Sequence, residues 1–227
     1  MNKKIIRRCR LFADMDDAML TRALELFRAR EQRYEKGDFI HSVAVPMSAF
    51  GLVLEGHVQV LRDDRNGHHM IMANVGVGDT FGESLAYLGR PSPVYIVAVT
   101  DCRIMWLYTE GVASPAVMSN PDMAELSCRF TKMLAARALA MNDRIQILSQ
   151  LTIRAKINAL LSQHAVAAGA DSFILPFDRE DMAFYLGTDR SALSRELGKM
   201  RREGLIDFHG NAFKLLSPDI RQAEDGM

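Results

Sequence analysis

The spacing of hydrophobic positions changes along the chain, and each change predicts a different kind of element. In residues 17–29 (DAMLTRALELFRA), Leu20, Leu24 and Phe27 share one face of a predicted helix. From about residue 31 to residue 108 the pattern becomes short β-like runs separated by glycine-containing breaks. The runs expected as strands are 39–45, 49–54, 57–61, 69–74, 94–99 and 103–107. Many short strands at such spacing predict a β-sandwich, barrel or roll.

A long helix is predicted from Pro121 to Leu151, where helical periodicity continues without a glycine or an internal proline. Two apolar stripes can be drawn on it: Leu134, Ala138, Met141, Ile145 and Leu148, and Leu126, Phe130, Met133 and Ala140. Each apolar face of a helix is buried against another part of the protein, so a helix with two such faces needs two packing partners. We therefore expect one face to pack on the β-domain and the other on a second copy of the chain. A core helix inside a monomer is the alternative, but the β-domain is too small to wrap so long a helix.

The C-terminal part of the sequence predicts a winged helix-turn-helix. A helix over residues 152–168 ends at Gly169, and residues 175–216 then read as helix, tight turn, helix and β-hairpin. Asp178 suits the N-cap of the first helix, Gly187 the left-handed turn, and Thr188 or Asp189 the cap of the second helix. The expected organisation is α+β, with a β-domain over 1–119, a dimerisation helix over 120–151 and a DNA-binding domain over 152–227.

The second helix of this motif has a basic outward face. Its expected inward stripe is Leu193, Leu197 and Met200. The predicted DNA-binding residues are Arg179, Thr188, Arg190, Ser191, Ser194, Arg195 and Lys199. Arg190 and Arg195 can bond guanine in bidentate fashion, the serines can donate to bases or phosphates, and Lys199, Arg179 and Arg202 can neutralise phosphates. A merely solvated charged face would not explain the glycine turn, the hairpin and the basic bias together.

Composition argues against a membrane protein and against a disulfide-rich protein. The chain has 227 residues, is 48% hydrophobic and has no net charge, so the basic face is a local feature of a neutral protein. Because no signal peptide and no run of about 18 apolar residues occurs, we expect a cytoplasmic protein without a membrane partner. Cys9, Cys102 and Cys128 are scattered and odd in number, which argues against a disulfide framework and a compact cysteine metal site.

Several motifs resemble those of the CRP/FNR family of bacterial transcription regulators. They are YEKGDFI at 34–40, GLVLEGHVQV at 51–60, GDTFGES at 78–84 and, most specific, GTDRSALSRELGKMRREGLI at 187–206. The resemblance implies a β-roll (a double-stranded β-helix) that binds an effector, and a homodimer that binds a pseudo-palindromic operator. RNA polymerase and a small-molecule effector are the further expected partners. At the position of Ser191 the family often has a glutamate that accepts from cytosine, so we expect this operator to differ at that base.

The sensory end departs from the cyclic-nucleotide-binding members that it resembles. Gly82 and Glu83 match the start of the phosphate cassette, but the positions of the phosphate-binding arginine and hydroxyl residue fall on Pro93 and Val94. Neither side chain offers a cation or a donor to a phosphate. The polar pair that would read the base falls near 138–139, which is Ala-Leu. We therefore predict no tight cAMP or cGMP binding, and interpret Glu83 as a structural turn residue.

The cysteines, the histidines and a possible pocket suggest other modes of sensing. Cys9 alone cannot supply the thiolates of an iron–sulfur cluster. Haem stays open, with His41, His57, His68, His69 and methionines as conceivable ligands, although surface histidines and core methionines are the simpler interpretation. Cys128 could form a redox-sensitive bridge to its symmetry mate, but a buried structural cysteine is expected. A small effector remains, in a pocket formed by Phe81, Glu83, Tyr87, Tyr95, Met133, Arg137 and Met141. Arg137 could meet an anionic ligand, or form an ion pair.

An enzyme is the main alternative class, because β-rolls resemble cupins. A cupin metal site needs alternating histidines, whereas His68 and His69 are adjacent and would point to opposite faces of a strand. We find no Ser/His/Asp arrangement or phosphate loop on a suitable turn, so no catalytic or metal-binding residues are predicted. A β-roll that binds a ligand without binding an operator would leave the basic helix unexplained. The sequence therefore predicts a DNA-binding transcription regulator.

Overall fold

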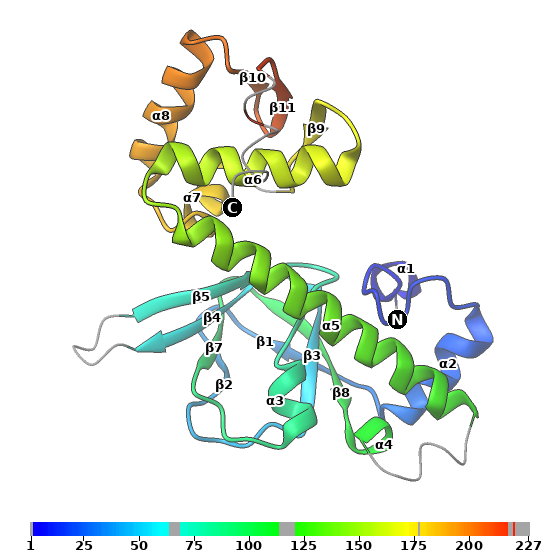
Figure 1. Cartoon of the computed structure of the whole chain (residues 1–227). Helices are drawn as coiled ribbons and strands as arrows, with labels where there is room; N and C mark the ends of the chain where they lie inside the picture. Colours follow the sequence, from blue (N-terminus) through cyan, green and yellow to red (C-terminus); the bar gives the residue numbers. More distant parts are fainter. Residues whose placement is uncertain (1, 64–68, 114–120, 177, 218–219, 221–227) are drawn as a thin grey trace. The chain divides into compact units, whose positions relative to one another are not determined.

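The computed structural model describes residues 2–63, 69–113, 121–176, 178–217 and 220 (Figure 1). Its helices are α1 (Lys3–Ile6), α2 (Asp17–Leu26), α3 (Glu83–Leu88), α4 (Glu110–Ala113), α5 (Pro121–Ser149), α6 (Ile153–Ala168), α7 (Arg179–Tyr185) and α8 (Arg190–Arg202). The chain divides into two compact units, Met1–Ala136 and Arg137–Met227, and the division falls within α5. The predicted three-part division into β-domain, helix and DNA-binding domain stays a prediction.

The first unit contains two antiparallel four-stranded sheets, with the orders β1-β8-β3-β6 and β2-β7-β4-β5. The strands are β1 (Arg30–Tyr34), β2 (Phe39–His41), β3 (Ala49–Glu55), β4 (Val58–Asp63), β5 (His69–Val75), β6 (Thr80–Phe81), β7 (Tyr95–Ala98) and β8 (Cys102–Tyr108). Each of the six predicted runs overlaps one of these strands. The predicted β-rich N-terminal domain is therefore confirmed.

Three strands differ from the prediction, and one of them, β6, is a two-residue strand that lies outside the predicted runs. The run predicted over 39–45 ends as a strand at His41, because Ala44 has a left-handed backbone (φ +63°) that is incompatible with a strand. β1 was not predicted, because its sequence REQRY has no apolar alternation. It is the edge strand of its sheet, and it pairs with β8 from Arg30↔Trp106 to Tyr34↔Cys102.

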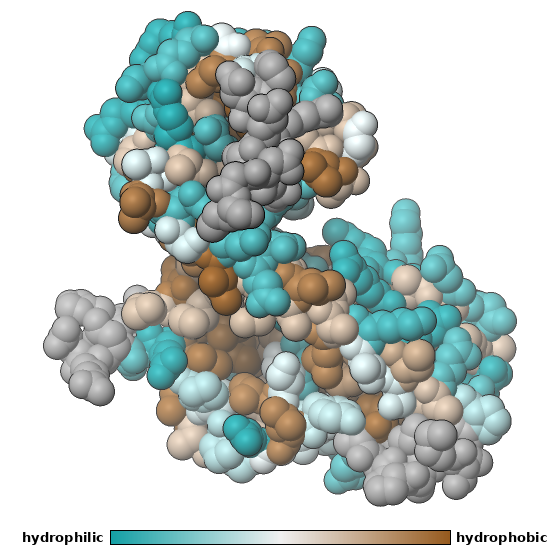
Figure 2. Space-filling model, in the orientation of Figure 1, coloured by the Kyte–Doolittle hydropathy of each residue, from teal (hydrophilic) through white to brown (hydrophobic). Residues whose placement is uncertain are grey.

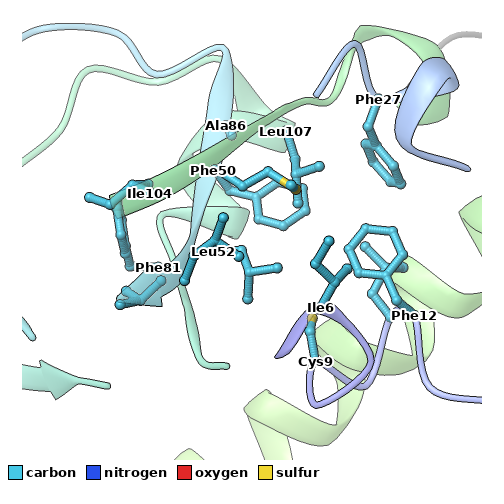
Figure 3. Close-up of a cluster of buried hydrophobic side chains, with 14 of the residues drawn as sticks. Ile6, Cys9, Phe12, Phe27, Phe50, Leu52, Phe81, Ala86, Ile104 and Leu107 are labelled. Atoms are coloured by element: carbon cyan, nitrogen blue, oxygen red, sulfur yellow. The ribbon is translucent and has the colours of Figure 1, made fainter. Parts of the chain in front are cut away.

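The core of the first unit includes the N-terminal segment as well as both sheets. Figure 3 shows Ile6, Cys9 and Phe12 directed toward side chains of β3 and β8. The rings of Phe12 and Phe27 meet edge to face at 6.1 Å, and those of Phe27 and Phe50 at 5.8 Å. Burial raises the pKa of the Cys9 thiol to about 11. Cys9 therefore serves as a small hydrophobic side chain of this core.

The predicted stripes of α5 have different environments. Leu126 and Phe130 are each 1% exposed in the first core, and Met133 and Leu134 pack partly against it. Further along, Met141, Ile145 and Leu148 are 61%, 60% and 38% exposed. Ala138 and Ala140 are exposed as well. Figure 2 shows hydrophobic surface along this helix. The predicted stripe of Leu134, Ala138, Met141, Ile145 and Leu148 is thus uncovered from Ala138 onward in the single chain.

The second unit has its own core, built from α5 to α8 and a small sheet. The sheet has the order β10-β11-β9, with β9 (Ser172–Ile174), β10 (Ile206–His209) and β11 (Ala212–Leu215). Thr152 caps α6 by accepting from the backbone N–H of Ala155, and Ile157, Leu160 and Leu161 are buried. Helices α7 and α8 with the hairpin β10–β11 confirm the predicted winged helix-turn-helix. The third strand, β9, was not predicted.

Candidate functional site

The start of α8 is fixed by Asp189. Its Oδ1 accepts from the backbone N–H groups of Ser191 (2.8 Å) and Ala192 (3.0 Å), and from the Ser191 hydroxyl (2.5 Å). These hydrogen bonds lower the pKa of Asp189, and the bond from the Ser191 hydroxyl has the largest effect. Of the two predicted caps, Asp189 is therefore the one that forms. Because the Ser191 hydroxyl donates to Asp189, its lone pairs remain available to accept from an amino group on a base edge.

The turn before α8 has the predicted geometry. Asp178 accepts from the backbone N–H groups of Glu180 and Asp181, each at 2.8 Å, and so caps α7. Gly187 has a φ of +58°, the left-handed conformation that favours glycine. A Cβ at Gly187 would also lie 3.2 Å from Leu148 Cδ2, so the end of α5 packs closely against this turn.

The exposed face of α8 carries most of the predicted DNA-binding residues. Leu193, Leu197 and Met200 are at most 1% exposed and form the inward stripe, as predicted. With a period of 3.6 residues, the centre of the opposite face falls on Ser191, Arg195 and Arg202. The exposed residues of α8 include Arg190, Ser191, Ser194, Arg195, Lys199 and Arg202. Thr188, in the turn, is partly buried.

Glu196 of α8 and Glu203, the residue that caps the end of this helix, are held by one arginine that the sequence pattern did not indicate. Arg154 of α6 bonds Glu196 Oε1 through Nε (2.5 Å) and Glu203 through Nη1 (2.7 Å) and Nη2 (3.1 Å). This contact lowers the pKa of Glu203. Glu196 and Glu203 lie on the flank of α8 that faces α6, so their charges are paired away from Ser191 and Arg195. The exposed face of α8 is basic for this reason.

Arg179, predicted to contact phosphate, lies against the hairpin. Its Nη2 donates to the carbonyl of Gly210 at 2.7 Å. Its guanidinium carbon lies 4.8 Å from the ring centre of Phe208 and 5.0 Å from that of Phe213. Partial burial lowers the pKa of Arg179. The predicted set thus comprises five exposed residues of α8, Thr188 in the turn before it, and Arg179, which contacts the hairpin.

Two of the predicted effector-pocket residues belong to the interior of the first unit. Phe81 is 1% exposed and meets Trp106 edge to face at 5.6 Å. A Cβ at Gly51 would collide with the Phe81 ring at 2.1 Å, so the glycine permits this close packing. Glu83 is 3% exposed, and Thr80 Oγ1 donates a short hydrogen bond to its Oε1. Glu83 therefore has a hydrogen-bond partner within the turn, as the structural interpretation of this residue expected.

The other predicted pocket residues lie in different surroundings. Tyr87 stacks on Phe130 with ring centres 5.5 Å apart, and the Tyr95 hydroxyl donates to Asp63 at 2.9 Å. Met133 lines a cavity of about 470 Å³ with Arg10, Glu125, Cys128, Arg129, Lys132 and Ala136. That cavity contains none of the other six predicted residues. Arg137 and Met141 are exposed and belong to the second unit.

His41 and His57 lie in no metal-binding cluster of the described residues, and one cysteine differs from the expectation. His41 Nε2 lies 3.0 Å from the carbonyl of Val45, and His57 is exposed, while His68 lies outside the described residues. Among the described residues, no group of three or more His, Cys, Asp or Glu side chains could hold a metal ion. Cys9 and Cys102 are buried, but Cys128 is exposed. The expectation of a buried Cys128 is therefore wrong for the single chain, because its position on α5 faces away from the core.

Comparisons with known proteins match both units. The family model "Cyclic nucleotide-binding domain" matches residues 31–113, and "Crp-like helix-turn-helix domain" matches residues 155–220. The nitrogen fixation regulation protein FixK of Bradyrhizobium diazoefficiens is 26% identical over 195 residues, which cover 83% of this chain and 79% of FixK. The transcriptional activator protein FnrL of Cereibacter sphaeroides is 23% identical over 200 residues, covering 84% of this chain and 74% of FnrL.

A solved structure shows the same fold. The structure of FixK2 from Bradyrhizobium japonicum aligns with a TM-score of 0.56 and 23% identity, covering 86% of this chain and 94% of FixK2. Among the described residues, no helix has the length and apolar character needed to cross a membrane.

Proposed function

Because this chain belongs to the CRP/FNR family of transcription regulators, we propose that it binds an operator through α8 and regulates transcription from it. The observation that carries the proposal is the exposed basic face of α8, with Glu196 and Glu203 paired to Arg154. Base edges in the major groove are read by side chains on one such helix face. A non-enzymatic role follows from this proposal, as does a cytoplasmic location, where bacterial DNA lies.

The position of each side chain on α8 suggests its role. Arg195, near the centre of the exposed face, bonds guanine O6 and N7, and Ser191 accepts from an amino group of a neighbouring base. Arg190, Ser194 and Thr188 lie toward the start of the helix, which enters the groove first. Lys199, on the flank nearer α6, neutralises a phosphate. A serine at position 191 in place of the family's frequent glutamate changes the preferred base there.

The active form in this proposal is a homodimer. Met141, Ile145 and Leu148 form an exposed apolar stripe on α5, which a second copy of the same helix would cover. A two-fold dimer presents two copies of α8, so its operator is pseudo-palindromic with half-sites about one helical turn apart. The functional division is then β-roll over 1–119, dimerisation helix over 120–151 and DNA-binding domain over 152–227, with RNA polymerase as the partner on DNA.

The effector of the β-roll is a small molecule other than a cyclic nucleotide. Pro93 and Val94 stand where a phosphate would need a cation and donors, and Glu83 already accepts from Thr80. Titration calorimetry with cAMP should therefore show no micromolar binding. Phe81, Tyr87, Tyr95, Met133, Arg137 and Met141 stay the candidate neighbours of the effector, and native mass spectrometry of freshly purified protein would identify it. A haem-based sensor is the alternative that a Soret band would reveal.

A thiol-based sensor is the second candidate, and one observation favours it. Cys128 is exposed and lines an open cavity of α5, so its thiol is accessible to an oxidant. Mild oxidation followed by non-reducing electrophoresis would show a disulfide-linked dimer in the wild type and none in Cys128→Ser. The absence of that dimer in the wild type would contradict the thiol-bridge hypothesis.

A mobility-shift titration with the DNA upstream of the protein's own gene tests the main proposal. Specific binding should weaken steeply as salt rises, because each neutralised phosphate releases counterions. Binding that is absent in every ligand state, or insensitive to salt, would contradict the proposal.

A further inference from the structure

The wing, which comprises β10, β11 and their turn at Gly210–Asn211, is attached to the helix-turn-helix by an arginine of α7. The Arg179 guanidinium lies over the rings of both Phe208 and Phe213, whose centres are 5.6 Å apart. Its Nη2 donates to the carbonyl of Gly210, in the turn of the wing, at 2.7 Å. A guanidinium over aromatic faces is held more strongly as water is excluded, and Phe213 is only 2% exposed.

A second arginine reaches the wing from α8. The Arg201 guanidinium lies 5.4 Å from the ring centre of Phe208, and its Nε bonds Asp207 Oδ1 at 2.9 Å. Phe208 is thus contacted by an arginine from each helix of the motif. Arg201 is on the flank of α8 that faces β10, so its charge is paired with Asp207 while Arg195 faces solvent.

We propose that Arg179 is a positioning residue that holds the wing against α7, and that Arg201 supports the wing from α8. The inference rests on the proposed function only in taking the wing to be part of the DNA-binding surface. For Arg179 to reach a phosphate with Nη2, the guanidinium would have to leave the two rings and the Gly210 carbonyl. Its contacts therefore assign it to the fold of the DNA-binding unit, in contrast to the phosphate-neutralising role that its charge suggests.

The proposal depends on the shape of the guanidinium and not only on its charge. A guanidinium is planar, so it can stack on two rings while its edge donates to a carbonyl. The ammonium of a lysine keeps the charge but lacks the flat face. Arg179→Lys should therefore loosen the wing, whereas a residue that only neutralised a phosphate would tolerate this exchange.

Hydrogen exchange of the wing amides in the full, DNA-free chain tests the proposal. In Arg179→Lys we expect amides of residues 206–215 to exchange about tenfold faster than in the wild type, as loss of the stacking and one hydrogen bond implies. Phe208→Leu, which removes one of the two rings that Arg179 contacts, should accelerate the same amides. The double variant should accelerate exchange by less than the two single effects combined, because both changes remove the contact between Arg179 and Phe208. Arg195→Lys is the matched control and should leave wing exchange unchanged.

Unchanged wing exchange in both Arg179→Lys and Phe208→Leu would overturn the proposal, and so would full additivity in the double variant. The measurement needs no DNA, so its outcome is separate from that of the operator proposal. If the wild type binds no operator while Arg179→Lys still loosens the wing, the proposed function fails and the role of Arg179 stands.

Discussion

The exposed stripe on α5 predicts a specific loss of dimer stability when Ile145 is truncated. Ile145 is 60% exposed in the single chain, and burying a whole isoleucine side chain contributes about 1.5–3 kcal/mol. Covering its exposed part thus contributes about 1–2 kcal/mol in each chain, and a two-fold interface contains the residue twice. Because alanine keeps Cβ, Ile145→Ala should weaken the dimer by about 2–3 kcal/mol, which raises its dissociation constant about 30- to 150-fold.

Sedimentation equilibrium over a concentration series, without DNA, measures this dissociation constant directly. Ile174→Ala is a matched control, because Ile174 of β9 is 72% exposed but lies outside α5. The control should dimerise like the wild type. An unchanged dissociation constant in Ile145→Ala, or an equal loss in both variants, would refute the assignment of this stripe to the dimer interface.

Further predictions concern α8. Arg195→Ala should cost roughly 1–3 kcal/mol of operator binding and relax selectivity at one base, whereas Lys199→Ala should weaken all sequences about equally; the opposite pattern in competition titrations would reverse the two roles. Gly198→Ala should raise the free energy of unfolding by about 1 kcal/mol, since its Cβ would meet Arg202 Nη1 at an ordinary 3.7 Å; a lower melting temperature would contradict this. Because the pKa of Asp189 is lowered in the folded state, its carboxylate stabilises the fold at pH values above its ordinary pKa of 3.8. This contribution is lost as the pH falls through the lowered pKa. In Asp189→Asn the free energy of unfolding should therefore fall less steeply as the pH is lowered. An unchanged dependence on pH would contradict the stabilising role of the Asp189 cap.

The elements that the sequence predicts well are those specified by neighbouring residues. The helix-turn-helix is specified by Asp178, Gly187 and the stripe of Leu193, Leu197 and Met200, all within a short stretch, and each has the expected place. The β-runs are similarly local, because their apolar residues and glycine breaks are adjacent in sequence.

Features that depend on distant residues were not predictable in this way. Arg154 pairs with Glu196, 42 positions away, and Arg179 with Gly210, 31 positions away, so no local spacing indicates either contact. The charge of Arg179 suggested a phosphate contact, but only the packed wing reveals the two rings beneath it. β1 was missed because its stability comes from pairing with β8 and not from its own polar sequence.

The most direct test of the operator-binding homodimer is selection of DNA sequences from a random pool by the purified protein. The selected DNA should contain two inverted half-sites about one helical turn apart, and affinity for it should fall steeply with salt. Ser191→Glu should change the preferred base at one position of each half-site. Selection of no sequence above background, or of a single site without two-fold symmetry, would contradict the proposal that this chain reads an operator as a homodimer.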